Sequence, residues 1–178
     1  MKPLSALLAA TMLCCASCQR PGAAPAIEKG EVMLSGADSA AFLDRMSSQS
    51  YVTEAEAVEG IRLILQKEDK VSFAKAIDEL QTAGIVSDRW RFKADDHATK
   101  GMVAYMVYQM CNIRGGMTLM VFGPSRRYCL KELQFRGLMG EGLSYNAVTG
   151  MEFVSVLTRA DEYRETGKVS RVLRQDGR

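Results

Sequence analysis

The chain has 178 residues, of which 47% are hydrophobic and 25% charged, and its formal net charge is +2. This length fits one domain together with export or tether segments, and the hydrophobic fraction is too high for a chain that stays disordered throughout. The small positive charge gives no indication of a nucleic-acid partner, because binding of phosphates needs a concentrated basic surface. A single folded domain is therefore expected.

The first seventeen residues have the pattern of an export signal. They read MKPLSALLAATMLCCAS, with Lys2 ahead of an apolar stretch from Leu4 to Leu13. Ten residues are too few to cross a bilayer, which takes about 20, so residues 1–17 are expected to be a signal peptide. The letters CAS before Cys18 resemble the bacterial lipoprotein signal, in which small residues precede an obligatory cysteine. An ordinary secretory signal, cut at a small residue, is the alternative.

The lipoprotein resemblance implies cleavage before Cys18 and a covalent lipid on that cysteine; no other cofactor is expected. Two or more acyl chains hold a protein stably on a membrane. In such signals an Asp after the cysteine directs retention in the inner membrane, and Gln19 at this position favours the outer membrane. The expected location is the cell envelope, lipid-anchored and facing the periplasm. Residues 18–37 are rich in Ala, Gly and Pro, and their lipidated start leads into an expected flexible linker.

Helical periodicity dominates residues 38–163, and these contain an internal repeat. The stretches DELQTAGIV (78–86) and KELQFRGLM (131–139) share ELQ and a glycine followed by two apolar residues. Each stretch predicts a helix that ends at its glycine, Gly84 or Gly137, where a left-handed conformation closes the last turn. The repeat predicts a helical domain of three copies, at about 38–66, 71–112 and 125–163.

A threonine precedes the second helix of each copy. These residues, Thr53, Thr99 and Thr149, are 46 and 50 residues apart. Glu56 follows Thr53, and Glu152 follows Thr149, at the spacing of a capping box. Thr99 has only the threonine half of the box. Helix capping alone accounts for these residues.

The copies resemble the S-layer homology (SLH) domain, a module of roughly fifty residues built as helix, loop and helix, whose loop ends in a TRAE-like motif. The middle copy, residues 76–107, carries the best match. The resemblance implies a mainly α fold with helix-loop-helix repeats in a pseudo-threefold arrangement, and grooves that bind anionic cell-wall polysaccharide. The TRAE arginine is replaced by Glu54, Lys100 and Gly150, so only one groove keeps a cation there. The expected ligand groove comprises Arg89, Trp90, Arg91 and Lys100.

Residues 113–123 interrupt the helical pattern. Gly115 and Gly116 break the preceding helix, and Met117 to Phe122 is expected to form a short strand or an extended buried segment. An apolar run of this kind is expected to pack across the repeats; the alternative is a partner-binding edge or the lining of a hydrophobic groove. The eleven methionines of the chain are expected to fill the core, with an adaptable binding surface as the alternative.

Little in the sequence indicates catalysis. Cys111 and Cys129 remain after the signal and Cys18 are set aside, and an oxidising compartment predicts a disulfide between them, with two buried free thiols as the alternative. His97 is the only histidine, so a His-rich zinc site is excluded, and no phosphate-binding loop occurs. We expect no catalytic residue, no metal and no enzymatic activity; an envelope hydrolase would need a base other than His97.

The basic end of the chain, residues 164–178, is expected to be a disordered tail, with contact to anionic lipid or wall polymer as the alternative. Together these features predict a membrane-anchored, non-enzymatic tether or scaffold of the envelope that binds a cell-wall polymer or an envelope protein. The second hypothesis is a periplasmic partner-binding protein or assembly factor that uses the apolar segment 117–122.

Overall fold

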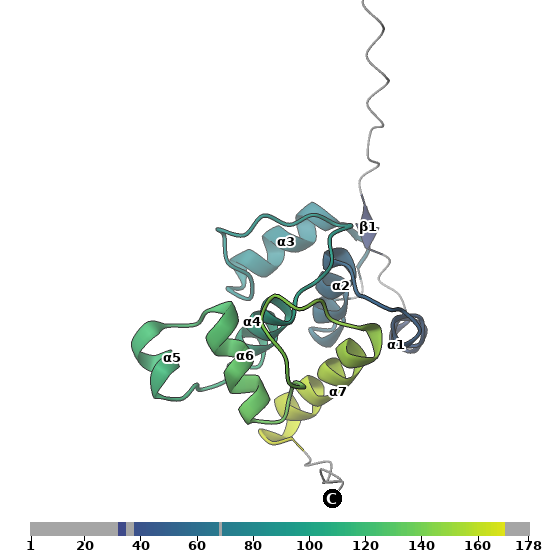
Figure 1. Ribbon diagram of the computed structural model, residues 1–178. Helices are drawn as coiled ribbons and strands as arrows, with labels where there is room; N and C mark the ends of the chain where they lie inside the picture. Colours follow the sequence, from purple (N-terminus) through teal and green to yellow (C-terminus); the bar gives the residue numbers. More distant parts are fainter. Residues whose placement is uncertain (1–31, 35–37, 68, 170–178) are drawn as a thin grey trace, which may run out of the picture.

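The computed structural model describes residues 32–34, 38–67 and 69–169; the predicted signal peptide, Cys18 and most of the predicted linker lie outside this part of the chain. The described part is mainly helical, as predicted, with one two-stranded antiparallel sheet (Figure 1). None of its helices is long and apolar enough to span a bilayer. In chain order the elements are β1 (Met33–Leu34), α1 (Ser39–Ser47), α2 (Glu54–Ile64), β2 (Val71–Ser72), α3 (Phe73–Thr82), α4 (Lys100–Met110), α5 (Met117–Phe122), α6 (Arg126–Phe135) and α7 (Gly150–Thr166).

Six of these helices form three consecutive pairs, α1–α2, α3–α4 and α6–α7, which match the three predicted copies except that α7 extends past residue 163. The second helix of each pair packs against the first helix of another pair. Thus α2 packs on α3, α4 packs on α6, and α7 packs back on α1 (Figure 1). The last pair therefore closes the packing onto the first.

A ring of three backbone hydrogen bonds lies where the three capping threonines begin their helices. The Val52 amide donates to the Val148 carbonyl at 3.0 Å, the Val148 amide to the Ala98 carbonyl at 3.0 Å, and the Ala98 amide to the Val52 carbonyl at 2.8 Å. All three residues are fully buried. The ring satisfies backbone groups that burial would otherwise leave unpaired, and it brings the N-termini of α2, α4 and α7 together.

The three predicted caps are confirmed, with one correction. Thr53 accepts from the Glu56 amide, and the Glu56 carboxylate accepts from the Thr53 amide at 2.9 Å, which completes a capping box. Thr99 caps α4 and Thr149 caps α7 through their side chains. The Glu152 carboxylate accepts a hydrogen bond from a lysine of α4 at 2.7 Å, so the box predicted for Thr149 has only its threonine half.

The repeated ELQ-glycine stretches have the same local structure. Gly84 and Gly137 follow the ends of α3 and α6 with φ of +71° and +77°, which confirms the predicted left-handed turns. The side-chain amides of Gln81 and Gln134 each donate to the carbonyl six residues further on, at 3.5 and 3.1 Å. The shared glutamine therefore fixes the loop that leaves each helix.

Two residues of the predicted linker belong to the fold. Met33 pairs with Ser72, and Leu34 pairs with Val71, in the antiparallel sheet. The Leu34 side chain is buried with 2% exposed. The prediction of a flexible linker over 18–37 is therefore wrong at these two positions, because burial of one apolar residue and backbone pairing fix the chain there.

The segment predicted as a strand, Met117 to Phe122, is the short helix α5. It starts after Gly116 and ends at Gly123, whose φ of +74° closes the turn. Leu119 is its only buried residue. The expectation that this run is covered is therefore wrong. A helix of six residues presents only one narrow face to its neighbour α6, so its remaining apolar side chains point outward.

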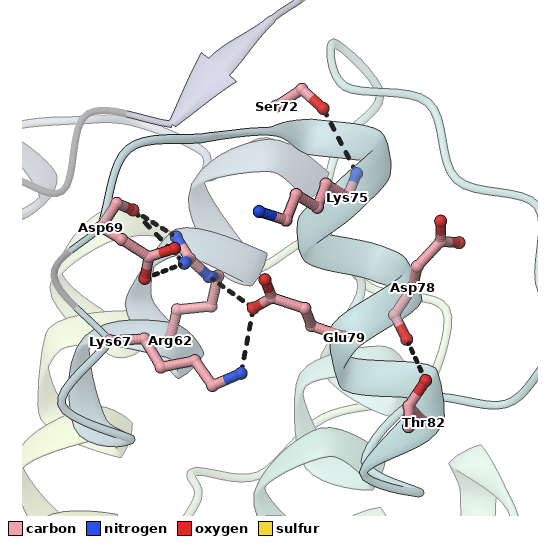
Figure 2. A network of polar contacts seen from close by, with 8 residues as sticks. All are labelled: Arg62, Lys67, Asp69, Ser72, Lys75, Asp78, Glu79 and Thr82. Atoms are coloured by element: carbon pink, nitrogen blue, oxygen red, sulfur yellow. Dashed lines mark hydrogen bonds and ion pairs between the residues drawn. The ribbon is translucent and has the colours of Figure 1, made fainter.

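A polar network joins α2 to α3 (Figure 2). The buried Arg62 guanidinium donates to the Asp69 carboxylate at 2.9 Å, and its Nε lies 3.8 Å from the Glu79 carboxylate. Lys67 contacts the same Glu79 at 2.9 Å. Arg62 lies in the last turn of α2, where the negative end of the helix dipole also favours a cation. The network thus compensates a charge that would otherwise be costly to bury.

Helix α7 continues past the predicted start of the tail. It runs to Thr166 and is closed by Gly167 in the left-handed conformation. The first residues of the predicted tail, 164–166, are therefore helical, and residues 170–178 lie outside the described ranges.

Candidate functional site

The predicted groove centres on Trp90, which lies in the loop between α3 and α4. Its amide donates to the Ser87 carbonyl at 3.1 Å, and its half-buried indole packs against the rings of Phe92 and Tyr105, at centroid distances of 5.9 and 4.9 Å. Phe73 of α3 extends this cluster by an edge contact to Phe92 at 6.4 Å. The cluster fixes the indole between α3 and α4, so Trp90 offers a rigid aromatic surface.

A cation lies on this surface, and it comes from the third helix pair. The guanidinium carbon of Arg126, the first residue of α6, is 4.0 Å from the centroid of the Trp90 ring. Among the aromatic rings, the face of an indole attracts a guanidinium most strongly. We name Trp90, Arg126 and the neighbouring Glu54 the Trp90–Arg126 site.

The position of Arg126 in its helix is unfavourable for helix stability. Arg126 and Arg127 occupy the first turn of α6, which contains no acidic residue. The N-terminus of a helix carries partial positive charge, so cations in this turn oppose the helix dipole. The position of this guanidinium is thus better explained by its contact with Trp90 than by stabilisation of α6.

Glu54, the first residue of α2, supplies the negative charge of the site. Its carboxylate accepts a hydrogen bond from the Lys93 amide at 2.8 Å. The pKa of Glu54 is raised, chiefly by burial and also by the charge of Asp96, although the Lys93 amide bond and the Arg126 and Lys93 charges act in the opposite direction. A raised pKa means that the surroundings only partly compensate this carboxylate.

Burial likewise lowers the pKa of Arg126, against the opposing effect of the Glu54 charge. Within the ranges that the structure describes, no hydrogen bond or ion pair engages the Arg126 guanidinium. No described residue therefore takes up its donors, although the Glu54 charge acts on the guanidinium. A guanidinium grips a carboxylate or a phosphate through two parallel hydrogen bonds. The arrangement is suited to binding an anionic group beside an aromatic surface.

The structure places the four residues of the predicted groove in different surroundings. Arg89 and Arg91 are exposed on either side of Trp90. Lys100 instead forms an ion pair with Glu152 of α7 at 2.7 Å and donates to the Glu141 carbonyl at 2.8 Å. Its side chain is only 11% exposed. Lys100 therefore joins α4 to the third helix pair and offers no free charge to a ligand.

Sequence reasoning missed Arg126. The signal that would have found it is the pair of arginines directly after the Ser125 cap, in a helix turn where acidic residues are normally favoured. Its nearness to Trp90 depends on α6 packing against α4, which no local pattern reveals.

The two cysteines of the body are free thiols, so the predicted disulfide is wrong. Cys111 caps the end of α4, and its Sγ lies 3.6 Å from the Ala160 carbonyl of α7. Cys129 is wholly buried in α6. Burial raises the pKa of Cys111 to about 11 and that of Cys129 to about 12, so neither thiol is a nucleophile at neutral pH.

His97 lies on the surface against the ring of Tyr51, with ring centroids 5.3 Å apart, and its backbone pairs with that of Thr53. The described residues contain no group of three or more His, Cys, Asp or Glu side chains that could hold a metal ion.

The sequence matches no known family model, and neither the curated proteins nor the solved structures contain a significant match. The geometry of the site is thus the basis for a function.

Proposed function

We propose that this protein is a lipid-anchored, non-enzymatic tether of the cell envelope, and that its Trp90–Arg126 site binds an anionic cell-wall polysaccharide. The observation that carries the proposal is the Arg126 guanidinium, stacked 4.0 Å from the Trp90 ring centroid. A carboxylate or phosphate on a sugar polymer would accept two parallel hydrogen bonds from Arg126, whose guanidinium is held in place by the Trp90 ring beneath it.

We also propose that the three helix pairs form a pseudo-threefold unit of the SLH type. Support comes from the closed ring of hydrogen bonds through Val52, Ala98 and Val148, and from the cyclic packing of α2 on α3, α4 on α6 and α7 on α1. In this proposal Glu54 stands at the position of the TRAE arginine in the first copy, and Arg126 of the third copy provides the cation beside it.

The anchor is the second half of the proposal. The signal-like residues 1–17 and Cys18 support it, and the lipid would hold the body at a membrane while the site holds the polymer. Such a protein needs no catalytic group. Its activity is binding, which mutation of one contact residue tests directly.

The experiment is co-sedimentation of the purified full chain with isolated cell-wall material of the source organism. Arg126→Ala is expected to weaken binding by roughly tenfold or more, because a charged hydrogen-bonded contact is lost. Arg126→Lys is expected to recover only part of the binding, because an ammonium lacks the two parallel donors. Binding of the parent chain should weaken as salt is raised.

The matched control is Arg45→Ala. Arg45 also lies over an aromatic ring, that of Phe42 in α1, at 5.4 Å, but it belongs to a different surface. It is expected to leave binding unchanged. Equal binding by the parent chain and Arg126→Ala, or an equal loss in both arginine variants, would contradict the proposal.

A further inference from the structure

Helix α5 exposes a compact set of apolar side chains. The set, which we name the α5 tip, has exposed fractions between 68% and 85% and comprises Met117, Met120, Val121 and Phe122. Isolated exposed apolar residues are common on protein surfaces, but four within six consecutive residues of one short helix are an unusual concentration, and concentrated exposed apolar residues mark interaction sites.

The tip projects from one edge of the molecule and is held there. In Figure 1, α5 lies at the periphery, beside α6 and away from the central helices. Leu119 anchors it to the core, the Gly116 amide donates to the Glu132 carboxylate of α6 at 3.2 Å, and the Phe122 ring lies 6.0 Å from that of Tyr128. A helix this short is unstable alone, so these contacts present the tip in a fixed orientation.

Two cations lie beside the tip, in a stretch of the chain that is rich in basic residues. The stretch 112–131 contains three arginines and one lysine and no acidic residue. Arg127 and Lys131, four residues apart on α6, are exposed and line a pocket of about 330 Å³ between α5 and α6, together with Thr118 and Tyr128. Like charges at this spacing on a helix repel one another, so Arg127 and Lys131 do not stabilise α6.

The carboxylate in the same pocket is already engaged. Glu132 pairs with Arg136 at 2.7 Å and accepts from the Gly116 amide. Glu132 therefore does not balance the charges of Arg127 and Lys131, which line the same pocket. An anionic group beside an apolar phase would complement both features of this surface.

We propose that the α5 tip inserts shallowly into an anionic phospholipid bilayer, with a lipid phosphate in the pocket between Arg127 and Lys131. Interfacial helices bury an apolar face at the boundary of headgroups and acyl chains, and nearby basic residues attract anionic lipid. This contact would be independent of the lipid on Cys18 and of the Trp90–Arg126 site. It would set the orientation of the body on the membrane.

The test places a tryptophan at the tip of the full chain, reconstituted into vesicles of phosphatidylcholine alone or of equal parts phosphatidylglycerol and phosphatidylcholine, with brominated acyl chains as quencher. Trp90 is the only native tryptophan, so the parent chain supplies the background to subtract. The matched control is Phe135→Trp, because Phe135 is 89% exposed and ends α6, at the opposite end from Arg127.

Phe122→Trp is expected to shift its emission to the blue and to be quenched, more strongly in the vesicles with phosphatidylglycerol, whereas Phe135→Trp stays unquenched. Adding Arg127→Ser and Lys131→Ser should remove the preference for phosphatidylglycerol; these side chains are exposed, so the fold is expected to tolerate the changes. No quenching at position 122, or equal quenching at both positions, would overturn the proposal. So would a blue shift that needs no lipid and grows with protein concentration, which would identify a second copy as the occupant, or one that appears only with a protein partner.

Discussion

Lys100 at the start of α4 and Glu152 in the first turn of α7 form an ion pair of 2.7 Å, with side-chain exposures of only 11% and 19%. The pair joins the second and third helix pairs of the fold, and Lys100 also donates to the Glu141 carbonyl in the loop between α6 and α7. Removal of one partner leaves a shielded charge without compensation, which is costly.

The first prediction therefore concerns Lys100. Glu152→Gln and Lys100→Met are each expected to lower the free energy of unfolding by about 2 kcal/mol, and the double variant by less than the sum of the two. Urea unfolding of all four chains gives the coupling. Lys93→Met is the control, because Lys93 and Asp96 form a pair with 75% and 57% exposure, whose loss should cost under about 1 kcal/mol. Additive effects of Lys100→Met and Glu152→Gln would show that the pair is not coupled.

The second prediction concerns Gly150, which follows the Thr149 cap at the start of α7. A Cβ added at Gly150 would lie 1.8 Å from the Met46 carbonyl oxygen and 2.8 Å from that of Gln49, and both are backbone atoms that cannot move aside cheaply. Gly150→Ala is expected to destabilise the fold by about 3 kcal/mol or more. Thermal or urea unfolding measures the loss.

Gly84→Ala is the control for this steric effect. At Gly84 the added Cβ meets nothing within 4 Å, and only the φ of +71° opposes it, at a cost of about 1 to 2 kcal/mol. If Gly150→Ala were as stable as Gly84→Ala, α7 would not approach the end of α1 as closely as described.

The third prediction concerns pH and the capping box. Burial acts to raise the pKa of Glu56, but hydrogen bonds from the Thr53 amide, the Gln49 side chain and the Thr53 hydroxyl, with the charge of Arg45, hold it below its ordinary value of 4.5. The ionised carboxylate thus stabilises the fold above pH 4.5, and this contribution is lost as the pH falls through the lowered value. Glu56→Gln should be less stable than the parent chain at neutral pH and converge with it in acid.

Glu54→Gln should show the opposite trend in the same urea titrations. Because burial raises the pKa of Glu54, the unfolded chain ionises first, and the stability of the parent chain falls as pH rises from 4.5 through the folded value. Glu54→Gln escapes this loss and should be no less stable than the parent chain at neutral pH. Parallel pH profiles for the two variants would contradict both assignments.

The fourth prediction concerns the thiols. With pKa values of about 11 and 12, Cys111 and Cys129 are protonated at pH 8, and both should resist alkylation until the protein unfolds. Peptide mapping after alkylation, with and without denaturant, separates them from the cysteines near residue 18. A peptide pair linked through Cys111 and Cys129, in protein isolated from the native envelope without reduction, would contradict the free-thiol arrangement.

Local sequence patterns predicted the elements whose causes are local. A threonine or a left-handed glycine acts within one helix turn, so Thr53, Thr99, Gly84 and Gly137 could be assigned correctly from their neighbours. The repeat of ELQ likewise indicated two equivalent helix ends. The end of α7 at Thr166, three residues past the predicted end of the third copy, did not follow from these signals.

Contacts between distant segments could not be predicted in the same way. Arg126 reaches Trp90, and Lys100 reaches Glu152, only because α6 and α7 pack where they do. The strand at Leu34 depends on its partner Val71, some forty residues away in the chain. The apolar composition of residues 117–122 indicated burial. In the structure most of these side chains are exposed, because α6 covers only a small part of α5.

The central claim is that the Trp90–Arg126 site binds an anionic wall polysaccharide, and Trp90 itself is the most direct reporter because it is the only tryptophan of the chain. Titration of the full chain with solubilised wall polysaccharide should change the Trp90 emission to a saturating level. Arg126→Ala should abolish the change over the same range, and Arg45→Ala should keep it. An unchanged emission at saturating polymer, or the same titration curve for Arg126→Ala, would contradict the claim.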